Sequence, residues 1–318
     1  MVSVSLGASG ALGAISLATS VAGLRLANPI MPASGTFGFG REAAKLYDIN
    51  RLGAVVTKGV TEQPREGNAL PRVTDCPAGM LNSVGLENPG VARVLRRELP
   101  ELRGMYGGPI IANVCGFSVE EYARNAEALA GSANVDALEI NISCPNVSHG
   151  GMSFGTDARA AGEVTRAARR VSKKPIWLKL SPNVTDITEI ARACEAEGAD
   201  ALCLINTLLG MRIDTRGRRP ILGNTFGGLS GPCVFPIALR MVYQVYRVVR
   251  IPIVGIGGIS GARDAVEMAL AGARAMQIGS AALVDPLAMI GILEGLPAEL
   301  EAMGAADFAA VVGGAHTV

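Results

Sequence analysis

The chain has 318 residues, of which 49% are hydrophobic and 18% are charged, and its formal net charge at pH 7 is +1. This composition supplies apolar side chains for a large core and excludes a disordered chain. The near-neutral charge and the aromatic content of 4% give no electrostatic or stacking reason to expect nucleic acid or an anionic membrane as a ligand.

The leader from Met1 to Ala22 is small, apolar and uncharged, and the first basic residue is Arg25. A signal peptide would need a positively charged start, and no apolar run reaches the ~20 residues of a membrane-spanning helix. We therefore expect a frayed end followed by a short strand, with no membrane address. This leader and the tail, residues 296–318, are both expected to be peripheral.

Eight apolar runs of strand length alternate with amphipathic segments along the rest of the chain. The runs are Pro29–Pro32, Ala54–Thr57, Ile110–Val114, Ala137–Ile142, Ile176–Leu180, Ala201–Ile205, Ile253–Gly257 and Ala275–Ile278. The amphipathic segments include Ser118–Ala130, Asp157–Val171, Val184–Glu197, Pro236–Val249 and Ala262–Ala271. This alternation predicts an α/β fold, a (β/α)8 TIM barrel formed by a single domain. A doubly wound sheet is the alternative, but the G-x-G-x-x-G turn that it would need does not follow the first run.

Two connections are too long for plain barrel loops. Gly59 to Pro89 follows the second predicted strand, and Leu208 to Pro232 follows the sixth. Long insertions in a compact domain are usually lids, binding loops or interfaces. Both insertions leave the carboxyl ends of strands, which is the face where barrels place their chemistry.

The fourth predicted strand ends in Asn141-Ile-Ser-Cys144-Pro-Asn146, which offers a thiol and two amides in one loop. Amides can bind a polar heterocycle, and a thiol beside them can move a proton. A free cysteine is often only a small core residue. Whether this motif indicates a functional site therefore depends on which residues lie at the ends of the other predicted strands.

Most of the predicted strands end in a polar residue or a glycine. These residues are Ser34, Lys58, Gly59, Asn113, Asn141, Lys179, Asn206, Thr207, Gly257, Gly258, Gly279 and Ser280. Glycines after the last two strands, with helices beyond them, suggest a backbone cradle for phosphate, although they could merely turn the chain. Lys179 lies inside a strand expected to be buried, so it should face a negative or electron-rich partner, and Lys58 repeats the pattern. A flavin mononucleotide would use both the cradle and the cations.

The chain has six cysteines, and no two of them form a C-x-x-C pair. We therefore expect no zinc site or iron–sulfur cluster held by this chain alone. A reduced, cytoplasmic protein is a better interpretation than a disulfide scaffold for a chain of this length. Cys194 falls in a helix pattern and Cys203 in a buried strand, so both are expected in the core.

Several motifs together resemble dihydroorotate dehydrogenase. They are residues 28–38, 57–61, 82–90 and 141–146, Asn206-Thr207, the glycine-rich residues 227–232, and Gly255-Ile-Gly-Gly258. The similarity runs from about Leu24 to about Glu294. It is to the catalytic subunit of the cytosolic class 1B form, in which the base is a cysteine, whereas the quinone-linked class uses serine. Cys144 is the residue that carries this distinction.

The resemblance implies oxidation of dihydroorotate to orotate in the de novo synthesis of UMP. Cys144 would remove the proton from C5, and hydride would pass from C6 to N5 of FMN. A free thiol has a pKa of roughly 8.5, so either the site favours thiolate or activity climbs with pH. The residues implied for the substrate are Lys58, Asn82, Ser83, Val84, Gly85, Leu86, Asn141, Asn206 and Thr207. Those implied for FMN are Ser34, Lys58, Gly59, Asn113, Asn141, Lys179, Ile205, Gly231, Gly257, Gly258, Gly279 and Ser280.

The resemblance also implies a partner for a homodimer of this chain. A second subunit that carries FAD and a [2Fe-2S] cluster would take the electrons to NAD, within a heterotetramer. Fumarate is the alternative acceptor if that subunit is absent. Two other functions remain open on the residues: a related flavin-dependent pyrimidine reductase, whose substrate lacks the orotate carboxylate, and a non-catalytic barrel that binds a phosphate ligand.

Overall fold

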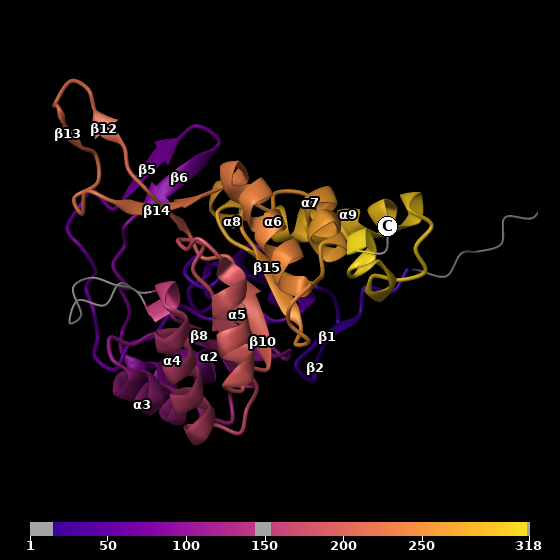
Figure 1. The fold of residues 1–318 in the computed structure, drawn as a ribbon, viewed down its shortest axis with the longest axis horizontal. Coiled ribbons are helices and arrows are strands. Elements are labelled where there is room, and N and C mark those ends of the chain that lie inside the picture. The colour runs from indigo at the N-terminus through magenta and orange to yellow at the C-terminus, as the bar shows by residue number, and fades with distance from the viewer. Residues whose placement is uncertain (1–14, 144–153, 317–318) are drawn as a thin grey trace, which may run out of the picture.

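The computed structural model describes residues 15–143 and 154–316. Eight parallel strands form one sheet in the order β3-β16-β15-β10-β9-β8-β7-β4 (Figure 1). The strands are β3 (Ile30–Pro32), β4 (Val55–Val56), β7 (Ile110–Val114), β8 (Ala137–Asn141), β9 (Ile176–Lys179), β10 (Ala201–Leu204), β15 (Ile253–Ile256) and β16 (Ala273–Ile278). Where β3 and β4 approach, the Gly53 N–H donates to the Ile30 carbonyl at 2.9 Å. The predicted barrel is therefore confirmed, nearly closed.

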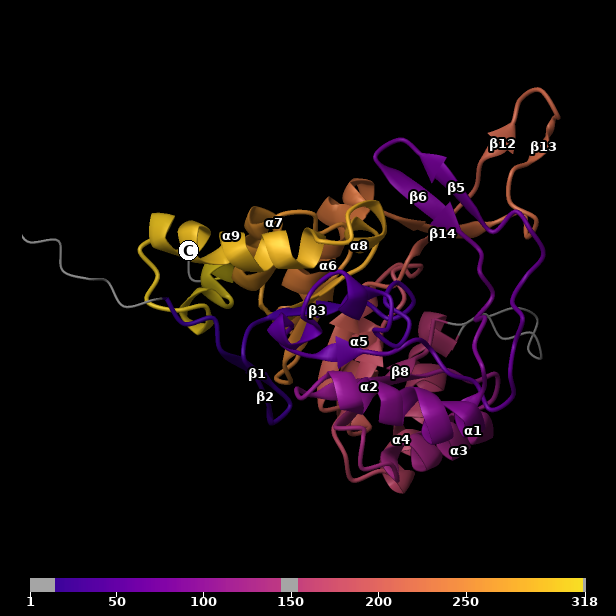
Figure 2. The ribbon, with the colours of Figure 1, turned by 180° about the vertical axis from the view of Figure 1, so that it is seen from behind.

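Helices lie outside the barrel, between its strands (Figures 1 and 2). They are α1 (Val91–Arg93), α2 (Leu99–Met105), α3 (Val119–Ala130), α4 (Ala158–Val171), α5 (Ile187–Ala196), α6 (Phe235–Tyr246), α7 (Ala262–Leu270), α8 (Ala281–Val284) and α9 (Ala288–Ala302). A π-helical turn, η3 (Val94–Glu98), joins α1 to α2. Short 3-10 turns are η1 (Ala43–Lys45), η2 (Ile49–Arg51), η5 (Phe154–Thr156), η6 (Pro232–Val234), η7 (Ala309–Val311) and η8 (Gly314–His316).

Side chains near the start of these helices fix where they begin. The Ser118 hydroxyl accepts the Glu121 N–H at 3.2 Å at the start of α3. The Asp157 carboxylate accepts the Ala160 N–H at 2.8 Å at the start of α4. Such caps satisfy N–H groups that have no partner within the helix.

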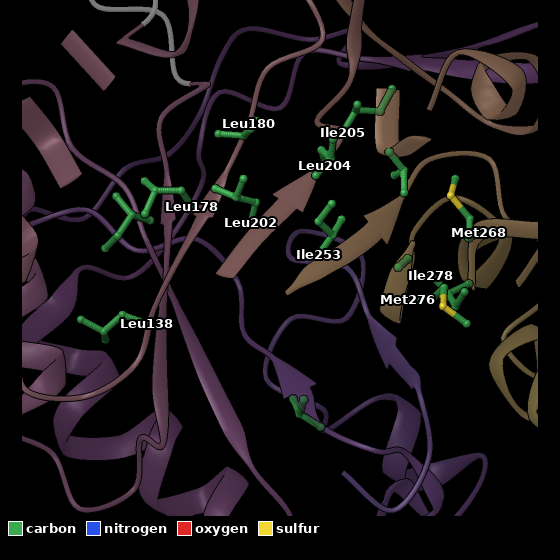
Figure 3. Close-up of a cluster of buried hydrophobic side chains, with 14 of the residues drawn as sticks. Leu138, Leu178, Leu180, Leu202, Leu204, Ile205, Ile253, Met268, Met276 and Ile278 are labelled. Carbon is green, nitrogen blue, oxygen red and sulfur yellow. The ribbon is translucent and has the colours of Figure 1, made fainter. Parts of the chain in front are cut away.

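The core has two layers, one on each face of the barrel sheet. Alternate strand residues such as Leu178, Leu202 and Ile253 pack outward against the helices (Figure 3). Their neighbours point inward and form a second cluster that includes Trp177, Ile111 and Val254. Because both faces are buried, the strands read as continuous apolar runs, which is why the sequence locates them.

A hairpin of β1 (Thr19–Val21) and β2 (Leu24–Leu26) closes the amino-terminal end of the barrel. Val21 and Leu26 join the inner cluster, and the Thr19 hydroxyl donates to the Arg274 carbonyl at the start of β16 at 3.0 Å. The short strand expected near Ala22 is therefore present, together with a second strand that pairs with it.

The two insertions combine into one structure at the other end of the barrel. The first contains β5 (Val73–Cys76) and β6 (Gly79–Asn82), and the second contains β11 (Leu208–Gly210) and β14 (Gly227–Ser230). These strands form a four-stranded sheet in the order β11-β14-β6-β5. A further hairpin, β12 (Ile213–Asp214) and β13 (Arg219–Pro220), projects beyond the barrel beside β5 and β6 (Figures 1 and 2). The sequence predicts the insertions but neither their strands nor this pairing.

The described part of the tail packs against the barrel's helical layer. Leu296, Leu300 and Phe308 have no exposed surface, and the Phe308 N–H donates to the Ser16 carbonyl at 2.9 Å. Although this segment lies outside the barrel, it therefore contributes to the packed core.

None of the described helices has the length and apolar character needed to cross a membrane.

Candidate active site

A layer of polar side chains lies inside the barrel. Four consecutive strands of the sheet and β16 each contribute one residue to it. The residues are Asn113, Glu139, Lys179, Cys203 and Gln277, from β7, β8, β9, β10 and β16. Strand register places Asn113 beside Glu139 and Lys179 beside Cys203. Lys179 lies two residues beyond Trp177, the register partner of Glu139. All five are buried. Buried polar groups need partners, so their contacts show what holds the layer together.

Glu139 is the centre of this layer. Its Oε1 accepts a hydrogen bond from Asn113 Nδ2 at 2.6 Å, and its Oε2 accepts one from Gln277 Nε2. Lys179 Nζ lies 4.0 Å from Glu139 Oε1. Neither Glu139 nor Gln277 is among the site residues predicted from the sequence. The available signal was a charged residue in the middle of the apolar strand Ala-Leu-Glu-Ile-Asn.

Lys179 connects this layer to the end of the first barrel strand. Its Nζ donates to Ser34 Oγ at 3.1 Å, and its side chain is only 5% exposed. Ser34 follows β3, whereas Lys179 ends β9, so the contact spans the barrel mouth. The structure thus brings together two residues predicted to hold the flavin ring.

Three of the residues predicted to bind the substrate meet at the ends of β8 and β10. Asn206 Nδ2 donates to Asn141 Oδ1 at 3.1 Å, and the Thr207 N–H donates to Asn206 Oδ1 at 2.8 Å. The Asn206 N–H donates to the Leu180 carbonyl at 2.9 Å, which holds it over β9. Tyr122, from α3, donates its hydroxyl to the Asn141 carbonyl at 2.6 Å. This chain of bonds fixes the amides at the mouth of the barrel.

Lys58 follows β4 and is half-buried. Loss of water around its ammonium lowers the pKa of Lys58, while the negative charge of Glu87 and, to a lesser extent, Cys115 acts in the opposite direction. Within residues 15–143 and 154–316, no hydrogen-bond acceptor is paired with its Nζ. A partly desolvated cation without such a partner is suited to an anionic ligand.

Gly59, the next residue, lets the chain pass close to Asn113. A Cβ at Gly59 would lie 2.7 Å from Asn113 Oδ1 and 2.8 Å from Cys115 Sγ. A larger residue would therefore displace the Asn113 side chain, which the Glu139 carboxylate also holds. Two residues predicted for the flavin are in this way packed against each other.

The loop Asn82–Leu86 is held by both insertions. Asn82 lies on β6 and donates from Nδ2 to the Gly228 carbonyl of β14 at 3.4 Å. Ser83 donates its N–H to the Arg72 carbonyl at 2.7 Å, while its buried Oγ has no hydrogen-bond partner among the described residues. Within the same residues, no hydrogen bond joins this loop to Asn141 or Asn206. A polar ligand at this loop would give the Ser83 hydroxyl the partner that it lacks among the described residues.

The predicted phosphate residues lie at the ends of β15 and β16. The backbone of Gly258 has a φ of 72°, and a Cβ there would lie 2.7 Å from both the Gly231 carbonyl oxygen and the Phe235 nitrogen. Glycine is thus required for the end of β15 to approach the turn before α6. Gly257 lies beside Ile205 in the same way. Gly279 and Ser280 lie between β16 and α8.

Cys144, predicted to be the catalytic base, lies outside the described residues. Ser143, the last described residue before it, donates its N–H to Asn141 Oδ1 at 3.3 Å. Cys194 and Cys203 are fully buried, as predicted for core residues.

Comparison with known proteins gives a family match over most of the chain. The family model for dihydroorotate dehydrogenase matches residues 16–300. A relative in Geobacillus kaustophilus, named dihydroorotate dehydrogenase B (NAD(+)), catalytic subunit, is 53% identical over 307 residues, which cover 95% of this chain and 98% of the relative. A relative with the same name in Bacillus caldolyticus is 52% identical, and the match covers 95% of this chain and 98% of the relative. Another in Enterococcus faecalis is 50% identical, and the match covers 91% of this chain and 92% of the relative.

Proposed function

Because this chain belongs to the dihydroorotate dehydrogenase family, we propose that it oxidises dihydroorotate to orotate in pyrimidine biosynthesis. The observation that carries the proposal is the grouping of polar side chains at one barrel mouth. There Asn206 binds Asn141, and Lys179 binds Ser34. An amide pair beside a buried cation suits a planar, polar heterocycle next to a ring that gains negative charge.

The residues at the mouth fit FMN. The site offers a buried cation at Lys179, a hydroxyl at Ser34 and closely packed glycine backbone at Gly231 and Gly258. Ser34, Lys58, Gly59, Asn113, Asn141, Lys179 and Ile205 would hold the ring and ribityl chain, and Gly231, Gly257, Gly258, Gly279 and Ser280 would complete the site around the phosphate. When bound, FMN supplies the two-electron acceptor for the hydride that leaves C6 of the substrate.

The substrate would lie between the loop Asn82–Leu86 and the amides of Asn141 and Asn206. The buried Ser83 hydroxyl, which has no hydrogen-bond partner in residues 15–143 and 154–316, and the Lys58 ammonium support this position, because each needs a polar partner. Lys58 would bind the carboxylate that distinguishes dihydroorotate from uracil-type substrates. Cys144 would remove the proton from C5, which is the general-base role that a thiolate can fill.

Replacing Gly228 with alanine tests whether Thr207 belongs to the substrate site. The new Cβ would lie 2.6 Å from Thr207 Cβ and closer still to its Oγ1, so the Thr207 side chain must move. Overpacking of this kind costs about 1–3 kcal/mol, and we expect the KM for dihydroorotate to rise about tenfold or more with FMN binding unchanged. Gly104→Ala is the matched control, because a Cβ at Gly104 meets open space. An unchanged KM in Gly228→Ala would remove Thr207 from the site.

Electrons would leave this chain through a partner. The names of the relatives specify a catalytic subunit and NAD(+), which supports a separate subunit that reduces NAD. We propose that this subunit carries FAD and a [2Fe-2S] cluster and binds a homodimer of this chain in the cytoplasm. We assign the proposed cluster to the partner because no two of the six cysteines of this chain form a C-x-x-C pair.

The proposal is tested by the anaerobic visible spectrum of the purified chain. We expect a yellow protein whose flavin absorption is bleached by dihydroorotate, and no reduction of NAD without a partner subunit. Bleaching by dihydrouracil but not by dihydroorotate would instead indicate a pyrimidine reductase. A colourless protein that does not bind added FMN would refute the cofactor and the site together.

A further inference from the structure

We propose that Glu139 is a positioning residue for the flavin: its carboxylate holds Asn113 and balances the charge of Lys179, and this lowers the midpoint potential of bound FMN. The inference rests on the proposed function, since it takes Asn113 and Lys179 as flavin-binding residues. None of the roles proposed above for substrate or FMN binding is assigned to Glu139, a buried acid in the middle of a barrel strand.

The contacts of Glu139 suit a carboxylate. Oε1 accepts a hydrogen bond from the side-chain amide of Asn113 on the adjacent strand β7, and Oε2 accepts one from that of Gln277 on β16, four strands away. Lys179 Nζ lies 4.0 Å from Oε1. Both carboxylate oxygens thus accept hydrogen bonds from amide N–H groups, and a cation lies beside one of them.

Glu139 and Lys179 are the charged side chains of this layer. Burial, and then the negative charge of Glu139, raise the pKa of the Cys203 thiol well above its usual range, so that thiol is neutral. The rest of the barrel interior is filled by apolar side chains, such as Trp177, which is paired with Glu139 in the sheet, and Ile111. In such surroundings water screens charge poorly, so one buried carboxylate has a large effect on nearby groups.

Lys179 contacts both the acid and the proposed flavin residue Ser34. Reduction of the flavin adds negative charge to its ring, which a full positive charge at Lys179 would favour. Glu139 offsets part of that charge and therefore makes FMN harder to reduce. The consequence is functional: reduced flavin of lower potential passes its electrons more readily to a weak oxidant such as NAD, whereas an unbalanced lysine would retain them.

The test is the ratio of the dissociation constants for oxidised and reduced FMN, measured by anaerobic titration of the FMN-free chain at pH 7. In Glu139→Gln the carboxylate is replaced by a neutral group of the same shape. We expect the ratio to change at least tenfold in favour of reduced FMN, which equals a midpoint potential about 30 mV more positive for a two-electron couple. The titration gives this ratio of dissociation constants even where FMN binds weakly.

Glu98→Gln is the matched control, because Glu98 is also a buried carboxylate that pairs with cations. It is 3% exposed and contacts Arg41 at 2.6 Å and Arg93 at 3.1 Å, outside the barrel. Both variants should lose stability, since each removes the charge of a buried carboxylate and leaves its cations, Lys179 for Glu139 and Arg41 and Arg93 for Glu98, with weaker partners. Only Glu139→Gln should change the ratio, which a purely structural role would leave as it is.

If Glu139→Gln does not fold, the same substitution can be tested in a chain that already carries Lys179→Met, which serves as a second background. Lys179→Met and the double variant Glu139→Gln/Lys179→Met differ only in the carboxylate, and the double variant carries no unpaired buried charge in this layer. The ratio should again move toward reduced FMN when the carboxylate is removed. A ratio that is unchanged or moves the other way in the background that folds would overturn the proposal. Failure of the unaltered chain to bind FMN would instead refute the proposed function.

Discussion

Replacing Cys144 with alanine is expected to lower the rate of dihydroorotate oxidation by about 10²–10⁴-fold, the contribution typical of a general base. FMN should stay bound, because Cys144→Ala leaves every residue proposed to hold it in place, and of these only Asn141 lies on the same strand end as Cys144. The measurement is the rate at which dihydroorotate bleaches the flavin absorption in a single anaerobic turnover, which isolates the proton and hydride transfers from later electron transfer.

Cys76→Ala is the matched control for this variant. Cys76 ends β5 in the insertion sheet and is half-buried, so its loss should leave the bleaching rate unchanged. Cys144→Ser adds a second check, because a hydroxyl loses its proton far less readily than a thiol and activity should then rise steeply with pH. A normal rate in Cys144→Ala would show that another group takes the C5 proton.

Replacing Lys58 with methionine is expected to weaken orotate binding by roughly 10–100-fold, which corresponds to the loss of a charged hydrogen bond worth about 1.5–3 kcal/mol. The chain should still fold, since the Lys58 ammonium has no hydrogen-bond partner among the described residues. The measurement is the dissociation constant of orotate, obtained from the change that it causes in the flavin spectrum. Dihydroorotate should show the same loss as a higher KM.

The pH dependence of orotate binding provides a second readout of the same residue. Desolvation lowers the pKa of Lys58 in the free chain, and a bound carboxylate would raise it again, so binding takes up a proton above the lowered pKa. Orotate affinity should therefore be constant below that pKa and fall as the pH rises through it. Lys58→Met should lose this alkaline decline.

Lys45→Met is the control, because Lys45 is an exposed lysine on η1 and should affect neither affinity nor its pH dependence. Retention of the full alkaline decline in Lys58→Met would assign the titration to another group. Equal losses for orotate and for an uncharged pyrimidine would show that Lys58 does not bind the carboxylate.

The barrel could be predicted from the sequence because each of its strands is buried on both faces. The run Ile110–Val114 coincides with β7, and the other runs differ from their strands by only a few residues at the ends. The cap at Ser118 also follows from local chemistry, a hydroxyl before two glutamates. These features depend on neighbouring residues in the chain, which a sequence displays directly.

The insertion sheet could not be predicted, because β6 pairs with β14 far along the chain. β14 has the sequence Gly-Gly-Leu-Ser, and glycine gives little indication of a strand. Glu139 is a different case, since its signal was present. A charged residue inside an apolar strand needs a partner, and Lys179 on the adjacent strand showed the same anomaly. Considering the two together would have predicted the buried pair.

The pairing of β6 with β14 also has a consequence for the order in which the protein acquires its activities. The Asn82 side chain and its acceptor at Gly228 are 146 residues apart. A ribosome that adds about 5–20 residues per second needs roughly 7–30 s to cover that distance. Throughout that interval the emerging hairpin of β5 and β6 lacks the strand that supports the loop Asn82–Leu86, which we propose binds the substrate. If that role holds, recognition of the pyrimidine is a late event in biosynthesis, completed only after six of the eight barrel strands have been made.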